Sequence, residues 1–244
     1  MKDYFSTQSK TYAAFRPTYP DDLYEFIFQN VKSKDNAWDC ATGNGQVAHK
    51  LAQHFRNVEA TDISAQQLEH GIRKENIHYS IAPAEKTGFQ DHQFDLITVA
   101  QALHWFDREA FYKEVRRVCK PGGILAVWGY SMLTIDPAID QLIGEFYNDT
   151  VGQYWDSARR LVEDEYRSIE FPFESIAAPP FSIEVKWTLE QLGGYLSSWS
   201  ATQNFIKEKR YDPVDELIKT MKRDNHQTLM PVSFPLFMRI GIVK

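Results

Sequence analysis

A turn with two glycines, set between a predicted strand and a predicted helix, constrains the fold of this chain more than any other feature. Residues 36–46 begin with an apolar edge, reach Asp39, and then place Gly43 and Gly45 with one residue between them. An amphipathic helical pattern follows at once. Glycine lets the backbone approach a ligand where a Cβ would collide, and the first turn of a helix has free N–H groups. We therefore expect a ligand to lie above this turn.

Strands and helices alternate along the first half of the chain. The pattern predicts strands at 37–40, 58–62, 77–81, 94–100 and 124–128, with helical patterns between most of them. The apolar run of the fourth strand is typical of a strand buried on both faces. Such alternation favours right-handed βαβ units and a parallel sheet, whose ligand lies at the carboxyl ends of the strands.

The second half of the chain breaks this alternation. Several helical patterns follow, a stretch with three prolines at 172–180 predicts a loop, and 182–188 alternates like a strand. We expect these helices to form a cap over the carboxyl edge of the sheet and to wall a pocket. The predicted organisation is an α/β core with an N-terminal arm over residues 1–130, a cap region over 131–230 that includes one core strand near 182–188, and a final core strand within 231–244.

The charge and composition of the chain favour a small-molecule partner. The formal net charge is −6 and no block of Lys and Arg is present, which argues against an extended nucleic-acid-binding face. No apolar run approaches the roughly 18 residues of a membrane span, and the first residues lack the layout of a signal peptide. Cys40 and Cys119 are expected to be free in a reducing compartment and to bind no metal. We therefore predict a cytoplasmic protein, either a monomer or a weak homodimer.

The glycine turn by itself fits more than one class of ligand. Residues 43–48 also satisfy the dinucleotide pattern G-x-G-x-x-(G/A), and Asp62 lies near the spacing at which an acid binds a ribose hydroxyl. An NAD-dependent oxidoreductase and a catalytically silent cofactor-binding sensor therefore stay open. Asp39 favours a different ligand, because a carboxylate just before the glycines suits a cation better than an anionic pyrophosphate. The turn KPGG at 120–123 is a second feature against the dinucleotide interpretation.

Five short motifs follow one another in a defined order along the chain. They are DCATGNG at 39–45, Asp62, Ala84 with Glu85, FDLI at 94–97, and KPGG at 120–123. Together they resemble the class I S-adenosylmethionine-dependent methyltransferases. Further stretches at 12–20, 100–106, 195–201 and 232–236 resemble the small-molecule subgroup that includes trans-aconitate-type enzymes and methyltransferase type 11 domains.

The resemblance covers nearly the whole chain and implies both a fold and a reaction. The implied fold is a Rossmann-like sheet of about seven strands, the last antiparallel, with a helical cap. The implied reaction is in-line transfer of the methyl group of S-adenosylmethionine to a small molecule, with a carboxylate or a hydroxyl group as the acceptor.

The resemblance also implies which residues contact S-adenosylmethionine. They are Tyr12, Arg16, Asp39, Ala41, Gly43, Gly45, Asp62, Ile63, Ala84, Glu85 and Gln101. Asp39 would lie near the ammonium group, Asp62 would bind both ribose hydroxyls, and Ala84 with Glu85 would meet the adenine. The family usually has glycine where this chain has Ala41. We therefore expect the cofactor to shift slightly or to bind less tightly, without loss of binding.

His104 is the candidate catalytic residue, because it follows the fourth strand at the carboxyl edge. The sulfonium already activates the methyl group, so the reaction depends mostly on positioning. A carboxylate acceptor needs no base, whereas a hydroxyl or amine must lose a proton, and His104 is the predicted base for that case. A structural histidine that fixes Trp105 is an equally open interpretation. Trp105, Tyr195 and Trp199 are predicted to line the acceptor pocket, although Tyr195 and Trp199 also fit a helix core.

Three arginines of the cap region allow two interpretations. Arg159, Arg160 and Arg167 could receive an acidic acceptor, or they could form a solvated helix face. The sequence favours the second of these.

Overall fold

An eight-stranded mixed sheet forms the centre of the structure, a computed structural model that describes residues 17–224 and 228–244. The strand order is β3-β2-β1-β4-β5-β8-β6, and β7 also pairs with β8. The strands are β1 (Asn36–Cys40), β2 (Asn57–Asp62), β3 (Ile77–Ile81), β4 (Phe94–Ala100), β5 (Cys119–Tyr130), β6 (Glu174–Ile176), β7 (Phe181–Trp187) and β8 (Met230–Ile242). Strands β1 to β5 are parallel, whereas β8 runs antiparallel to β5. The predicted Rossmann-like α/β sheet with an antiparallel last strand is confirmed.

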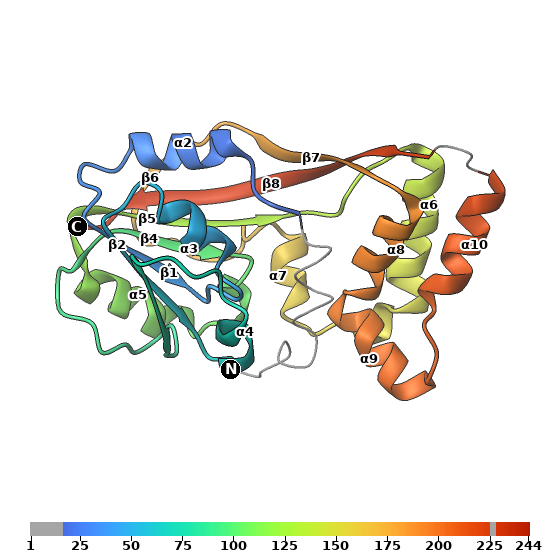
Figure 1. The fold of residues 1–244 in the computed structure, drawn as a ribbon, viewed down its shortest axis with the longest axis horizontal. Helices are drawn as coiled ribbons and strands as arrows, with labels where there is room; N and C mark the ends of the chain where they lie inside the picture. The colour runs from blue at the N-terminus through green and yellow to red at the C-terminus, as the bar shows by residue number, and fades with distance from the viewer. Residues whose placement is uncertain (1–16, 225–227) are drawn as a thin grey trace.

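Helices cover the sheet, and a second group of helices lies beyond its end (Figure 1). The helices next to the sheet are α2 (Asp21–Gln29), α3 (Gln46–Leu51), α4 (Ala65–Glu69) and α5 (Arg108–Val118). The second group, called the cap below, consists of α6 (Pro137–Glu145), α8 (Leu189–Ser197), α9 (Ser200–Lys209) and α10 (Val214–Asp224). Helix α7 (Arg159–Glu163) lies between sheet and cap, and the short helices are η1 (Leu103–Trp105), η2 (Phe146–Thr150) and η3 (Gly152–Tyr154). Among the described residues, no helix combines the length and the apolar character that a membrane span requires.

Two helices of the cap, α6 and α8, begin where the sequence supplies a capping side chain. The Asp136 carboxylate accepts the N–H groups of Ala138 and Ile139 at 2.9 and 3.0 Å, at the start of α6. At the start of α8, the Thr188 hydroxyl accepts the N–H of Gln191, whose side chain accepts the N–H of Thr188 in return. Each cap satisfies N–H groups that have no partner inside the helix, and a good cap contributes about 1 kcal/mol.

Two details of the sheet differ from the expectation. Strand β6 lies within 172–180, where three prolines predicted a loop, and its three residues pair with the end of β8. A three-residue segment is too short to show an alternating pattern in the sequence. Its extended conformation is set by its pairing with β8. The expected turn at 120–123 is a bulge inside the bounds of β5, with Gly122 at a φ of 80° and a register shift against β4.

Strand β8 runs along both the core sheet and the cap. Residues 230–236 pair with β7, and residues 236–242 pair with β5. The Phe234 ring lies 5.3 Å from the ring of Tyr195 in the cap, whereas Ile240 lies in the core of the sheet. One strand therefore contributes side chains to both hydrophobic cores.

Candidate functional site

The glycine turn, residues 41–45, connects β1 to α3 in a conformation that most side chains disfavour. Ala41, Gly43 and Gly45 have φ values of 54°, 57° and 81°. A Cβ on Gly45 would lie only 2.0 Å from the hydroxyl oxygen of Tyr79. A Cβ on Gly43 would have no neighbour nearer than 4.0 Å, so open space lies next to this residue. The turn therefore has a packed side and an open side.

Asp39 supports the turn from below. Its side chain is only 1% exposed. One carboxylate oxygen accepts the hydroxyl of Thr98 at 2.8 Å, and the other accepts the hydroxyl of Thr42 and the N–H of Ala48. Burial raises the pKa of Asp39 to about 6, although the hydrogen bonds from Thr42 and Thr98 favour the ionised form and oppose this shift. A cation near the turn would favour that form as well, and the predicted contact with an ammonium group stays a prediction.

Asp62, at the end of β2, ties the glycine turn to the next helix. One of its carboxylate oxygens accepts the N–H of Gly43 at 2.9 Å, and the other accepts the N–H of Ser64 at 2.9 Å. Both oxygens of this half-buried carboxylate therefore hold backbone N–H groups, one in the glycine turn and one just before α4. Ile63 follows it and is also half-buried.

A cavity of about 90 Å³ lies over the glycine turn, at the carboxyl ends of β1, β4 and β5. Its lining includes Pro17, Tyr19, Asp39, Ala41, Thr42, Gly43, Asn44, Gln46, Val47, Ala100, Gln101 and Tyr130. The residues predicted to bind the cofactor that share this lining are Asp39, Ala41, Gly43 and Gln101. The structure therefore brings together residues that are distant in the chain, such as Asp39 and Gln101, which are 62 positions apart.

Two residues of this cavity, Ala41 and Gln101, are non-glycine residues in the left-handed conformation, each with a φ of 54°. The backbone N–H of Gln101 donates to the carbonyl of Trp128 at 2.8 Å, and its side chain donates to the carbonyl of Tyr130 at 3.3 Å. A left-handed conformation costs free energy in a residue with a Cβ, and such residues are found most often at functional sites. Their position on one cavity wall agrees with a binding role.

The other predicted cofactor contacts lie further along the edge or outside the described residues. Ala84 is 4% exposed and follows β3, and the neighbouring Glu85 carboxylate accepts the N–H of Asp107 at 3.0 Å. Their contact with an adenine stays a prediction. Tyr12 and Arg16, predicted to close over the cofactor, lie outside the described residues.

His104 lies in η1 and faces the helix α7. Its Nδ1 is 2.7 Å from the hydroxyl oxygen of the buried Tyr166, and its ring lies 4.6 Å from the ring of Trp105. Burial and the positive charge of Arg159 lower the pKa of His104 to about 3, although Asp156 opposes this shift. The imidazole is therefore neutral at physiological pH. A base role stays a prediction, and so low a pKa makes a weak base.

Tyr195 and Trp199 are each only 4% exposed and lie in the core of the cap. Their rings are 5.8 Å apart, and Trp199 also contacts Tyr147 and Trp155 at 5.7 and 5.5 Å. This placement agrees with the helix-core interpretation of the two residues. Their contact with an acceptor stays a prediction, as does that of the half-buried Trp105.

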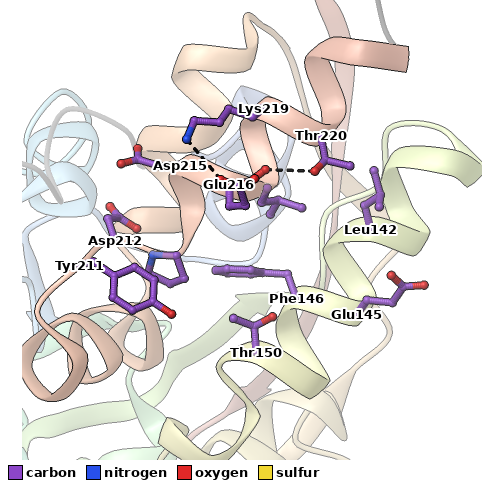
Figure 2. Close-up of a pocket in the computed structure, with 12 residues that line it drawn as sticks. Leu142, Glu145, Phe146, Thr150, Tyr211, Asp212, Asp215, Glu216, Lys219 and Thr220 are labelled. Atoms are coloured by element: carbon purple, nitrogen blue, oxygen red, sulfur yellow. Dashed lines mark hydrogen bonds and ion pairs between the residues drawn. The ribbon is translucent and has the colours of Figure 1, made fainter.

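A larger hollow, of about 590 Å³, lies in the cap between α6 and α10 (Figure 2). Figure 2 shows apolar side chains such as Leu142 and Phe146 beside the acids Glu145, Asp212 and Asp215. The residues drawn there include none of the predicted site residues. Size alone therefore does not locate the site, and the converging polar groups at the glycine turn are the better guide.

Sequence reasoning missed Thr98 and Tyr166. Thr98 holds Asp39 from β4, and its hydroxyl in an otherwise apolar run from residue 96 was a signal that could have been used. Tyr166, which contacts His104 from 62 residues away, left no local signal.

Comparison with known proteins gives one consistent result. Residues 38–127 match a family model described as "Methyltransferase domain". A Dictyostelium discoideum protein named as a methyltransferase is 36% identical, over 97% of this chain and 93% of the relative. A solved structure from Anaeromyxobacter dehalogenans, titled as a type II methyltransferase, has a TM-score of 0.86 and 33% identity, over 94% of this chain and 98% of that chain. A Schizosaccharomyces pombe protein, named as an uncharacterised methyltransferase, is 25% identical over 90% of this chain and 88% of its own length.

Proposed function

Because this chain belongs to the class I S-adenosylmethionine-dependent methyltransferases, we propose that its acceptor is a small molecule held between the sheet edge and the cap. The observation that carries this proposal is the position of the cap. Its helices lie beyond the end of the sheet, on the side to which the end of β5 leads (Figure 1). A site walled in this way suits a small acceptor better than a nucleic acid, which the net charge of −6 also disfavours.

The residues of the edge fit S-adenosylmethionine, which is the cofactor of the family. The open side of the glycine turn at Gly43 leaves room for the methionine part, and Asp39 lies below it. Asp62, a carboxylate at the end of β2, is the group of this edge that suits ribose hydroxyls, and Ile63, Ala84 and Glu85 follow along the same edge toward the adenine. Gln101 lines the methionine side.

The task of the protein in this reaction is to align the acceptor with the methyl group. The cofactor supplies a methyl group on a sulfonium, so that a new bond to the acceptor forms as the carbon–sulfur bond breaks and the sulfur becomes neutral. Holding the reacting atoms in line contributes roughly 7–11 kcal/mol. A hydroxyl acceptor would also need a base, and the low pKa of His104 makes it a poor one. A carboxylate acceptor, which needs no base, therefore fits the site better.

Ligand-induced stabilisation tests the proposal. We expect S-adenosylmethionine and S-adenosylhomocysteine to raise the melting temperature, since a ligand at about 100 Kd adds roughly 2.7 kcal/mol to the free energy of unfolding. Stabilisation by NAD alone would contradict the assignment. Methyl turnover on a panel of small metabolites then separates an enzyme from a catalytically silent sensor. A cytoplasmic location, a monomer or weak homodimer, and region boundaries near 130 and 230 stay predictions.

Replacement of Ala41 by glycine tests the strain in the turn. We expect Ala41→Gly to leave stability within about 1 kcal/mol of the wild type, because relief of a left-handed alanine offsets the added chain entropy. S-adenosylhomocysteine should bind equally well or up to about threefold more tightly, as measured by calorimetry. Ala52→Gly is the matched control, because Ala52 has an ordinary helical φ of −66°. This variant relieves no strain and should lower the free energy of unfolding by about 0.5–1 kcal/mol. Weaker binding by Ala41→Gly would show that the alanine methyl is needed.

A further inference from the structure

The three arginines of the cap region have different surroundings. Arg160 and Arg167 are exposed, and Arg167 pairs with Glu165. Arg159 is half-buried, and its guanidinium carbon lies 5.0 Å from the centre of the Trp155 ring and 5.9 Å from that of Tyr147. The solvated-face interpretation therefore fits two of the three, but not Arg159.

A hydrogen bond and two aromatic rings hold the guanidinium of Arg159 in place. Its Nε donates to the hydroxyl of Tyr147 at 3.2 Å, and Tyr147 in turn donates to Glu163. Among the residues that the structure describes, none of the ion pairs within 4.0 Å includes Arg159. Arg117 shows the contrast, since it pairs with both Asp91 and Glu114. A fixed, half-buried cation without a counter-ion suits an anionic ligand.

His104 presents a second hydrogen-bond donor beside this cation. Burial keeps Tyr166 protonated, since its pKa is well above the usual range, and the N–H groups of Leu103 and His104 face its oxygen. The Tyr166 hydroxyl is therefore the donor in its hydrogen bond to Nδ1 of His104. The proton of the neutral imidazole then lies on Nε2, which can only donate. Within the described ranges, Nε2 makes no hydrogen bond.

Two acids close to these donors, Asp156 and Glu163, accept hydrogen bonds from groups other than the Arg159 guanidinium. The Asp156 carboxylate, whose charge reaches His104, accepts the N–H of Ala158 at 2.9 Å. Glu163 accepts the hydroxyl of Tyr147. Neither acid forms an ion pair with Arg159 in the part of the chain that the structure describes, so the guanidinium remains available.

We infer that the acceptor carries a carboxylate, which binds the guanidinium of Arg159 and the Nε2–H of His104. This inference rests on the proposed function and adds to it the two residues that bind the carboxylate and select for it. His104 acts here as a hydrogen-bond donor to the acceptor and removes no proton from it. Helix α7, which carries Arg159, packs against η1, which carries His104, so both groups lie where the cap meets the carboxyl edge of the sheet.

The test uses a panel of aliphatic and aromatic mono-, di- and tricarboxylates, each paired with its amide. Methyl transfer from labelled S-adenosylmethionine, and binding to the protein saturated with S-adenosylhomocysteine, are measured for every pair. We expect at least one carboxylate, and none of the amides, to bind and to be methylated. Arg159→Gln should raise KM for that acid about tenfold with kcat nearly unchanged, and Arg159→Lys should recover part of the loss.

Matched variants separate this role from others. Arg160→Gln, an exposed neighbour on the same helix, should behave as the wild type. His104→Ala removes the Nε2–H donor and should raise KM for the acid several-fold, whereas loss of a base would lower kcat at least a hundredfold. Unchanged stabilisation by S-adenosylhomocysteine shows that each variant is folded and binds the cofactor.

Three outcomes overturn the inference. They are equal use of acids and amides, a KM that Arg159→Gln leaves unchanged, and no binding or turnover of any carboxylate. A protein that S-adenosylhomocysteine does not stabilise fails in the proposed function itself, which is a separate result.

Discussion

We expect Gly45→Val to weaken S-adenosylhomocysteine binding roughly a hundredfold, which corresponds to about 2.7 kcal/mol. Gly45 has a φ of 81°, and a Cβ there would lie 2.0 Å from the hydroxyl oxygen of Tyr79. A β-branched residue in this conformation is strained by roughly 1–3 kcal/mol, so the turn must move. That movement would disturb the hydrogen bond from the N–H of Gly43 to Asp62. Calorimetry with S-adenosylhomocysteine and urea unfolding measure the two effects.

Gly88→Val is the matched control for this variant. Gly88 has no left-handed φ, and a Cβ there would meet nothing within 4 Å. Both affinity and stability should stay at the wild-type values. Normal cofactor affinity in Gly45→Val would contradict the view that a rigid glycine turn forms the floor of the site.

Asp62→Ala should weaken cofactor binding by a similar factor, about a hundredfold. A hydrogen bond to a charged group contributes about 1.5–3 kcal/mol, and two ribose hydroxyls would lose this acceptor. The variant also leaves the N–H groups of Gly43 and Ser64 without their partner, so the turn loses support. Asp62→Asn keeps one acceptor oxygen and should show an intermediate affinity. Titration of each variant with S-adenosylhomocysteine gives these values.

Asp136→Ala controls for the structural part of this effect. The Asp136 carboxylate also accepts two backbone N–H groups, but at the start of α6 in the cap. We expect this variant to lose about 0.5–2 kcal/mol of stability and to bind the cofactor normally. Equal losses of affinity in the two variants would mean that Asp62 acts only through folding.

The part of the site that could be predicted from the sequence is the part that local chemistry determines. The strand, the left-handed glycines and the helix follow one another within residues 36–51, so pattern and turn chemistry suffice to place them. The carboxyl ends of β1, β2 and β4 then meet because parallel strands require it, which brings Asp62 and Gln101 to one edge.

The remainder depends on contacts between distant segments. Burial in the core raises the pKa of Asp39, while the hydrogen bond from Thr98 opposes this shift. The tautomer of His104 depends on Tyr166, and its pKa depends on Arg159. None of these neighbours lies near its partner in the chain. Strand β6 exists only because the end of β8 lies beside it. Residue type therefore predicts candidate positions for chemistry, but not the protonation state of the groups at those positions.

The double pairing of β8 limits how this scaffold can be recombined. The cap is inserted between β5 and β8, which would suggest that it can be exchanged as a cassette to change acceptor choice. However, residues 230–236 belong to the cap side through β7, whereas 236–242 belong to the sheet through β5. A chimera spliced at the end of α10 would therefore join mismatched halves of one strand. A splice point near Leu236 keeps each half with the core in which it packs.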